Sequence, residues 1–299
     1  MICGVLLLDK PQGLSSNQAL QRVKRATGAD KAGHAGSLDP LATGMLPICL
    51  GEATKIAGEL AGARKRYRFA IALGSRTDTG DREGAVIETL PVPALGAQEV
   101  RSVLARFLGR QLQVPPMYSA LKRGGQPLYR LARTGVEVER DAREIEIGEL
   151  VPLTVGAAAL ELEALCSKGT YIRVLAEDIA RALGTCGHVA RLRRLWVAPF
   201  ESEPMQTLEA VEQACRSGAT PAVLAADRAL PALASITVAQ AAAVRLAHGQ
   251  PIASPDPRLA GRVRLYDERG RFLGIGEADG RGGVRPKRMF VLVAGGGSG

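Results

Sequence analysis

The sequence predicts an α+β protein in which strands and helices are interleaved over a large first region and a small β-rich module follows. Two observations support this class. Several short segments alternate apolar and polar residues, as half-buried strands do, whereas others repeat apolar residues with helical spacing. From about Leu230 the pattern changes to short strands separated by glycine turns. With 299 residues, 46% of them hydrophobic, the chain can bury a sizeable core.

The first elements are a strand, a helix and a loop. Val5 to Leu8 is a short apolar run, and Ser15 to Asn17 offers N-caps to the helix that follows. The apolar side of this helix consists of Ala19, Leu20, Val23 and Ala26. Gly28 is expected to end it. Residues 33–44 contain too many glycines for a helix and too many apolar residues for a solvated linker, so we expect an ordered loop.

The spacing of apolar residues predicts the strands and helices in the middle of the chain. The expected strands are 66–73, its neighbour 84–90, 143–151 and 159–166, and the expected helices lie near 100–108 and 169–183. Pro115-Pro116 and Gly124-Gly125 interrupt regular structure, which predicts a basic, mobile loop there. Strands and helices therefore alternate along this region.

The C-terminal part differs in texture and charge. An alanine-rich helix over 238–247 precedes short strands around Val263, Phe272 and Met289. Beyond Leu230 there are ten lysines and arginines and five acids, a local charge of +5. We therefore divide the chain into a first domain over 1–230, with a basic insertion at about 115–145, a basic β module over 231–293, and a flexible tail over 294–299.

Charge and cysteine usage restrict the class of partner and site. The chain carries 39 lysines and arginines against 30 acids, a net charge of +9, which favours a polyanionic partner but equally fits a protein that is merely basic. Five scattered cysteines and three histidines disfavour a zinc site or a disulfide framework. Without a signal segment or an apolar run of about 20 residues, we expect a cytoplasmic protein with no membrane contact.

Asp39 is the one acidic residue of the glycine-rich loop. No second carboxylate lies within ten residues on its C-terminal side, which disfavours a paired-carboxylate hydrolase. By itself a loop aspartate is usually a turn or cap residue. Gly51-Glu-Ala-Thr-Lys55 lacks the second glycine of a phosphate-binding loop, and His34 with Asp39 would make a weak metal site. We therefore expect neither a metal nor another cofactor.

The loop Gly33-His-Ala-Gly-Ser-Leu-Asp39-Pro-Leu-Ala-Thr-Gly-Met-Leu-Pro47 resembles the catalytic loop of the bacterial tRNA pseudouridine-55 synthases, the TruB family. Further matching blocks, in the family's order, are Leu8-Asp9-Lys10-Pro11-x-Gly13-x-Ser15-Ser16, Lys65-Arg66-Tyr67-Arg68, Gly74-x-x-Thr77-Asp78-Thr79, Pro116-Met-Tyr-Ser-Ala-Leu-Lys122, Ser167-Lys-Gly-Thr-Tyr171-Ile-Arg173, and Gly187-His188-Val189 followed by Leu192-Arg193-Arg194. They cover about the first 200 residues. Ala35 and Ser37 depart from the threonine and alanine that the family loop often has.

The resemblance implies a fold and a reaction. It implies the pseudouridine synthase fold, an α+β structure with a large mixed, mainly antiparallel sheet flanked by helices, and a C-terminal module similar to PUA domains. The implied reaction is the isomerisation of a uridine in the TΨC arm of tRNA to pseudouridine. This reaction is redox-neutral, consumes no water overall and requires no cofactor.

The resemblance also assigns roles to residues that would otherwise be read as core or helix positions. Asp39 becomes the nucleophile, with attack on the pyrimidine C6 and on the ribose C1′ left as alternatives. Tyr67 is expected to stack on the flipped uracil and to assist proton removal from C5, and Arg173 to form a salt bridge that keeps Asp39 ionised. His34, Tyr171 and Leu192 are expected to contact the substrate, Leu192 as a wall of the uracil pocket.

Partners follow from the same comparison. Basic residues near the expected pocket are candidates for RNA contacts, namely Lys10, Lys65, Arg66, Lys122 and Arg123. We expect a monomer that binds the tRNA stem-loop and needs no obligatory protein partner. The alternatives are a catalytic subunit of a guide-RNA-dependent complex and a non-catalytic RNA-binding or tRNA-folding protein.

Overall fold

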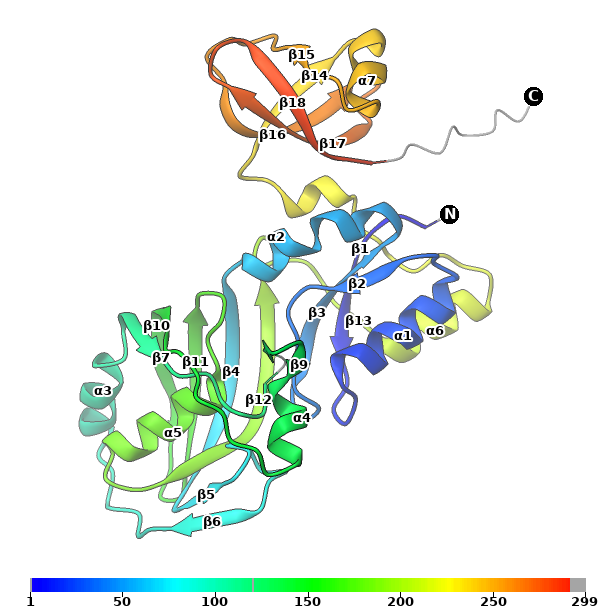
Figure 1. The fold of residues 1–299 in the computed structure, drawn as a ribbon. Coiled ribbons are helices and arrows are strands. Elements are labelled where there is room, and N and C mark those ends of the chain that lie inside the picture. The colour runs from blue at the N-terminus through cyan, green and yellow to red at the C-terminus, as the bar shows by residue number, and fades with distance from the viewer. Residues whose placement is uncertain (1, 120, 291–299) are drawn as a thin grey trace.

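The computed structural model describes residues 2–119 and 121–290, and a nine-stranded sheet dominates this part of the chain (Figure 1). The strands are β1 (Gly4–Lys10), β2 (Ala32–His34), β3 (Thr43–Leu50), β4 (Lys65–Leu73), β7 (Gly109–Gln113), β10 (Arg143–Val155), β11 (Ala159–Cys166), β12 (Gly187–Val197) and β13 (Gln206–Thr207). Their order is β13-β1-β3-β12-β4-β11-β10-β7, with β2 paired to β3. Within this sheet, among the described residues, only β1–β13 and β3–β12 pair in parallel, which confirms the mixed, mainly antiparallel sheet.

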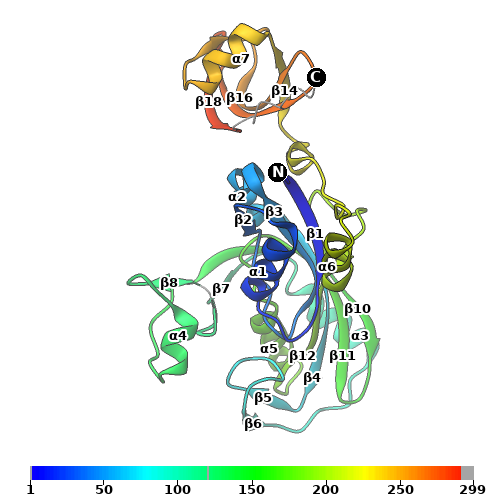
Figure 2. The ribbon, with the colours of Figure 1, turned by 90° about the vertical axis from the view of Figure 1, so that its right-hand side faces the viewer.

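Helices cover the sheet and connect its strands. They are α1 (Ser16–Thr27), the 3-10 helix η1 (Gly51–Ile56), α2 (Ala57–Gly62), α3 (Ala97–Ala105), α5 (Ile172–Ala182), α6 (Leu208–Arg216) and the 3-10 helix η2 (Ala226–Ala229). The predicted ends of α1 are confirmed: Ser15 forms a capping box with Gln18, and Gly28 is left-handed with φ 62°. α1 and α6 lie side by side (Figure 2). Arg22 joins them through a 2.7 Å contact with Glu212. No helix in the described part is long and apolar enough to cross a membrane.

The main core lies where the alternating residues of β4 face neighbouring strands and helices. Tyr67, Phe69 and Ile71 are at most 8% exposed and belong to one buried cluster with residues of β11, α1 and α5. Burial of one face of each strand accounts for the period of two in their sequences. The sheet is therefore a rigid base for the segments at its edges.

The structure differs from the predicted elements at several points. Residues 84–90 do form a strand, β6 (Val86–Thr89), but it pairs with β5 (Ser75–Thr77) in a separate two-stranded sheet and not with β4. The edge strand β7 and the central strand β12 were not predicted. β12 escaped because its middle, residues 190–194, contains three arginines and is interrupted by register shifts, so the apolar alternation is lost.

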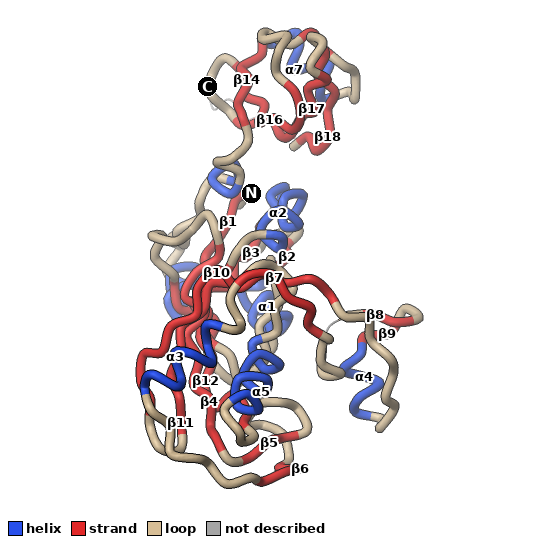
Figure 3. Tube along the Cα trace, turned by 90° about the vertical axis from the view of Figure 1, so that its left-hand side faces the viewer, coloured by secondary structure: helices blue, strands red, loops and turns tan. Residues whose placement is uncertain are grey.

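Residues 114–142, which we call the arm, stand out from the body between β7 and β10 (Figures 2 and 3). The arm was predicted as an irregular loop. It contains instead a small hairpin, β8 (Lys122–Arg123) with β9 (Gln126–Pro127), and the helix α4 (Leu128–Arg133). Glycines 124 and 125 supply the positive φ values, 57° and 82°, that the two-residue turn requires.

The C-terminal unit is a second sheet at one end of the body (Figure 1). It contains β14 (Ala234–Val238), α7 (Gln240–Ala247), β15 (Ile252–Ala253), β16 (Ala260–Asp267), β17 (Phe272–Asp279) and β18 (Gly283–Met289). Its Ile275 and Phe290 share a buried cluster with Ile56 and Leu60 of the body. The predicted tail, 294–299, lies outside the described residues.

Candidate active site

Asp39 lies on the loop between β2 and β3, in residues 35–42. Its neighbours Leu38 and Leu41 are 5% and 3% exposed, so they anchor the loop in the core while the Asp39 side chain stays 39% exposed. Ser16 exchanges two hydrogen bonds with the backbone of Leu38, donating at 3.0 Å and accepting at 2.7 Å. The amide of Gly13 donates to Pro40 O at 2.9 Å. The apolar residues of the loop and the start of α1 thus fix the position of the carboxylate.

Arg173, in the first turn of α5, binds both oxygens of Asp39. Its Nε lies 2.9 Å from Asp39 Oδ2, and Nη2 donates to Oδ1 at 3.3 Å. The guanidinium also donates to Thr79 O at 2.8 Å and to Tyr118 O at 2.6 Å. Its side chain is only 5% exposed. The ion pair expected from the sequence is present, and the same guanidinium links the Asp39 loop, the β5–β6 connection and the arm.

The electrostatic balance at Asp39 differs from the expectation. Burial is the largest single influence on the pKa of Asp39 and raises it above its ordinary value, although Arg173 lowers it. The nearby Asp81 raises the pKa further, whereas Lys10 lowers it. Arg173 therefore offsets part of the cost of ionising a desolvated carboxylate and does not hold the pKa below the usual range.

Asp81 is a site residue that the sequence did not single out. It is 5% exposed, and its Oδ2 lies 3.9 Å from Arg173 Nε. Thr79 Oγ1 donates to Asp81 Oδ1 at 2.8 Å, which fixes the carboxylate. At Gly80, where φ is 75°, a Cβ would meet Glu177 at 2.6 Å, so only glycine fits. The signal that could have found Asp81 is its place directly after the block ending at Thr79.

Tyr67 is the third residue of β4 and 8% exposed. It lies in register with Ala164 on one side and Arg194 on the other. Burial raises the pKa of its hydroxyl, and the charge of Arg194 opposes this rise. The sequence assigned no separate role to Arg194, yet it is 0% exposed and lies opposite this predicted site residue.

Tyr171 and His34 flank the same region. Tyr171 is the N-cap residue of α5; its amide donates to Gln113 Oε1 at 2.8 Å, and burial raises the pKa of its hydroxyl. His34 ends β2 half-buried, and its Nδ1 is buried with no hydrogen-bond partner among the described residues. Burial first, and the charge of Arg194 second, lower the pKa of His34. A neutral imidazole is therefore favoured.

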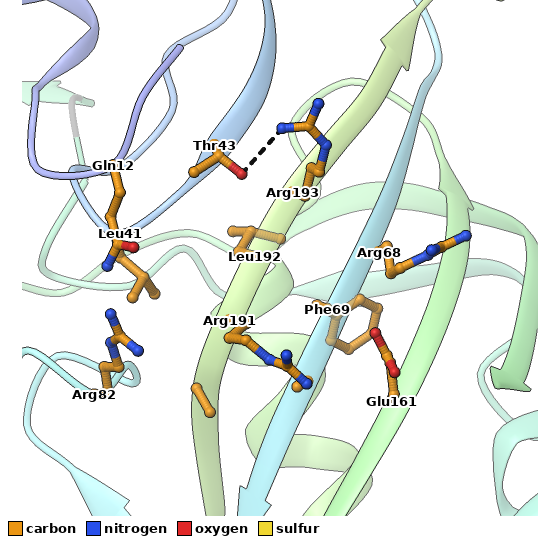
Figure 4. A pocket seen from close by; sticks show the side chains of 12 residues that line it. Gln12, Leu41, Thr43, Arg68, Phe69, Arg82, Glu161, Arg191, Leu192 and Arg193 are labelled. Carbon is orange, nitrogen blue, oxygen red and sulfur yellow. Dashed lines mark hydrogen bonds between the residues drawn. The ribbon is translucent and has the colours of Figure 1, made fainter. Parts of the chain in front are cut away.

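Leu192 lies on β12 beside Phe69 and lines a cavity of about 250 Å³ (Figure 4). Figure 4 also shows Arg193 donating to Thr43 Oγ1, at 3.4 Å, at the rim where β12 and β3 diverge. Within the described residues, the lining of this cavity does not include Asp39. It does include Leu41, two residues further along the loop. The role of Leu192 as a pocket wall stays a prediction.

Two of the predicted RNA contacts need correction. Lys10 is 0% exposed and donates to Leu14 O at 2.6 Å and to Pro11 O at 2.8 Å. Lys65 is 6% exposed and donates to Ala63 O at 2.7 Å and to Ala61 O at 3.0 Å. Burial lowers the pKa of each ammonium to about 8. Ammonium groups that are buried and bound to carbonyls cannot meet a phosphate.

The other predicted RNA contacts are placed differently. Arg66 is bound by Glu163 at 2.7 Å and by Glu149, and it lies 5.7 Å over the ring of Trp196. Its charge is therefore already neutralised by acids of the neighbouring strands. Lys122 and Arg123 form β8 of the arm, and their side chains lie outside the described part of the chain.

Comparison with known proteins gives one family along the chain. Residues 24–172 match the model of the TruB family pseudouridylate synthase N-terminal domain. Residues 173–230 match the tRNA pseudouridylate synthase B C-terminal domain, and residues 234–290 match the model of the pseudouridine synthase II TruB C-terminal region.

Curated relatives agree over almost the full length. The tRNA pseudouridine synthase B of Chromohalobacter salexigens is 49% identical and covers 97% of this chain and 94% of its own. The protein of the same name from Aromatoleum aromaticum is 47% identical over 98% of this chain and 94% of its own.

Solved structures share the fold. A chain of a Cbf5-Nop10-Gar1 complex has a TM-score of 0.70 at 24% identity, covering 93% of this chain and 79% of that one. A chain of an H/ACA RNP bound to a substrate RNA has a TM-score of 0.72 at 22% identity, covering 96% and 85%. With the family models and the curated relatives, these findings show that the chain belongs to the TruB family of pseudouridine synthases.

Proposed function

We propose that this chain isomerises uridine 55 in the TΨC arm of tRNA to pseudouridine, with Asp39 as its nucleophile. The observation that carries the proposal is the Asp39 carboxylate, which is 39% exposed on a fixed loop and bound through both oxygens by Arg173. The name tRNA pseudouridine synthase B, carried by relatives that are 46–49% identical, supports the substrate.

The proposed chemistry needs a nucleophile but no external reagent. The carboxylate attacks either the pyrimidine C6 or the ribose C1′, and the N1–C1′ bond breaks. The base then turns, C5 bonds to C1′, the C5 proton leaves, N1 gains a proton and Asp39 is released. In this proposal Tyr67 assists proton removal at C5. The sum is an isomerisation without net oxidation or hydrolysis.

The reactive carboxylate must be ionised, and desolvation makes its ionisation costly. Desolvation raises the pKa of Asp39, and the opposing charges of Arg173 and Lys10 favour the anion. A partly desolvated carboxylate is also a stronger nucleophile than a fully hydrated one, because fewer water molecules must leave before attack. Burial next to a fixed guanidinium thus supports covalent catalysis at this position.

The target base must leave its stack before it reaches Asp39. Unstacking costs a few kcal/mol, which contacts elsewhere on the RNA must offset. We assign contacts with the target nucleotide to His34, Tyr171 and Leu192. Contacts with the RNA backbone are assigned to Lys122, Arg123 and the C-terminal unit. In this proposal 1–230 is the catalytic domain and 231–293 the PUA-like domain, and the enzyme acts as a cytoplasmic monomer without a protein partner.

Experiment can distinguish two other functions from the proposed one. A subunit of a guide-RNA-dependent complex would be inactive alone, and a tRNA-folding protein would bind RNA without modifying it. The solved complexes, at 22–24% identity, support the shared fold and not an assembly.

The test maps pseudouridine in an unmodified tRNA transcript after incubation with the purified chain. We expect one new pseudouridine in the TΨC arm with the natural chain and none with Asp39→Asn, while tRNA affinity stays within a few-fold. Asp30→Asn, which changes an exposed aspartate before β2, is the matched control and should leave turnover unchanged. Turnover retained by Asp39→Asn, or no modification by the natural chain, would contradict the proposal.

A further inference from the structure

Arg194 is a buried cation without a carboxylate partner. Its side chain lies in β12, is 0% exposed and is the largest fully buried side chain among the described residues. In that part of the chain no acid forms an ion pair with it, whereas Arg173 and Arg193 each bind an aspartate. Burying an unpaired charge is costly, so a merely space-filling role would be met better by an apolar side chain such as those of Met45 and Val197 nearby.

The guanidinium of Arg194 instead binds both flanks of the Asp39 loop. Its Nη2 donates to Gly36 O at 2.9 Å, three residues before Asp39. Its Nε donates to Met45 O at 2.6 Å, six residues after Asp39. One planar group therefore binds the chain on both sides of Asp39. Its rigid fork fixes the separation of these two carbonyls better than a flexible ammonium could.

The backbone around Arg194 adds a second constraint on the same loop. Arg194 is in register with Gly44 of β3, where the sheet continues in parallel. A Cβ at Gly44 would lie 2.1 Å from Arg194 O, so the two strands approach each other closely only because residue 44 is glycine. At Gly36, with φ 80°, a Cβ would lie 3.5 Å from Arg194 Nη1 and 3.3 Å from Lys65 Cε.

Arg194 also lies opposite Tyr67 across the β4–β12 pair. Residues at paired positions of neighbouring strands have their side chains on the same face of the sheet, close enough to interact. The positive charge of Arg194 accordingly opposes the rise that burial causes in the pKa of the Tyr67 hydroxyl. A guanidinium has donors only, so toward the Tyr67 oxygen it can act only as a donor.

We infer that Arg194 is a positioning residue for the proposed reaction, holding the Asp39 loop in a fixed place beside Tyr67. The inference rests on the proposed function, because positioning matters only if Asp39 and Tyr67 act on the substrate. One side chain thus acts on the loop of the nucleophile and lies beside the tyrosine. The position of Arg194 in the sequence reveals neither relation.

The test measures single-turnover pseudouridine formation in a tRNA transcript with enzyme in excess, beside tRNA affinity and urea unfolding. Arg194→Met should lower the rate about 100-fold, the size expected for a small misplacement of reacting groups, while the Kd for tRNA stays within about threefold. Arg194→Lys should lose about tenfold, since an ammonium can bind one carbonyl but not span both. The control Arg22→Met, which removes the Arg22–Glu212 pair between α1 and α6, should keep the natural rate.

A double-mutant cycle separates positioning from stability. In the Tyr67→Phe background, Arg194→Met should cost at most about 30-fold, because part of its effect acts through the hydroxyl. A rate per folded molecule that is unchanged in Arg194→Met, or a loss confined to Kd, would overturn the inference. Equal losses in both backgrounds would overturn its Tyr67 part.

The outcomes also separate this inference from the proposed function. If Arg194→Met does not fold, Arg194→Lys decides, and full activity of that variant would overturn the inference. If the natural chain modifies tRNA and the variants match it, only the inference fails. If the natural chain does not modify tRNA at all, the proposed function fails and the inference fails with it.

Discussion

The site around Asp39 and the C-terminal unit differ in where their charges lie. Lys10, Arg173 and Arg194, which lie around Asp39, are at most 4% exposed, and their donors bind specific oxygens. In the C-terminal unit most charged side chains lie at the surface, with Asp267 buried as an exception, and pairs such as Lys287–Glu277 are about half exposed. Buried charges act at short range on fixed groups, whereas exposed charges are screened and contribute to association. The first arrangement suits chemistry and the second suits anchoring of a polyanion.

Among substitutions that test this difference between buried and exposed charges, we expect the largest effect at Arg173. Arg173→Met removes the group that most lowers the pKa of Asp39, so that pKa should rise further above its ordinary value. Because the reactive form is the anion, the rate falls as pH decreases through this pKa, and the acid limb of the pH–rate profile should move to higher pH. We expect turnover near neutral pH to fall about 100-fold or more. Single-turnover rates across pH 5–9 measure both effects.

Arg173→Met also leaves Asp39 and Asp81 without their shared cation. We expect unfolding in urea to show a loss of about 3 kcal/mol, with tRNA affinity of the folded fraction little changed. Arg181→Met, an exposed arginine of the same helix paired with Asp178, is the control and should change neither. An acid limb that stays in place in Arg173→Met would contradict this electrostatic account.

A smaller effect is expected on the C-terminal unit. Arg285 and Arg288 are exposed on β18, and their replacement by alanine should weaken tRNA binding several-fold. If both contact phosphates, the slope of log K against log salt should decrease by about two. The rate at saturating enzyme should not change. A loss of rate at saturation would contradict the division between chemistry at the Asp39 site and anchoring in the C-terminal unit.

The smallest effect is expected at the junction of the two regions. Arg262 binds Glu59 through two 2.8 Å hydrogen bonds, but the side chains are 40% and 37% exposed. A double-mutant cycle to alanine should give a coupling of about 0.5 kcal/mol, because solvent screens the pair. The apolar contact through Ile275 and Phe290 should hold the junction without it. A coupling above about 2 kcal/mol would show that the pair behaves as a buried one.

Local patterns predicted the elements whose residues carry their own signals. The alternation from Tyr67 to Leu73 predicted β4, and Ser15 with Gly28 predicted both ends of α1. The block around Asp39 predicted the family, and with it the pairing with Arg173 that the structure contains. These features depend on residues that are close in sequence or on motifs that stay recognisable without the fold.

Other features needed the packed chain. Lys10, Lys65 and Arg194 are of residue types that usually lie at the surface. From the sequence, Lys10 and Lys65 were predicted to contact RNA. Their burial depends on carbonyls that surround each head group; for Arg194 these come from segments about 150 residues away. The same holds for Asp81, whose closeness to Arg173 depends on how α5 meets the β5–β6 connection.

By itself, then, the sequence determined the family, the nucleophile candidate and the amphipathic elements, because these depend on local order. The tertiary structure alone decided which charges are buried, that burial raises the pKa of Asp39 although Arg173 pairs with it, and that Arg194 binds both flanks of the loop. The reason is physical: desolvation and hydrogen-bond geometry are properties of the surroundings of a side chain, and distant parts of the chain supply those surroundings.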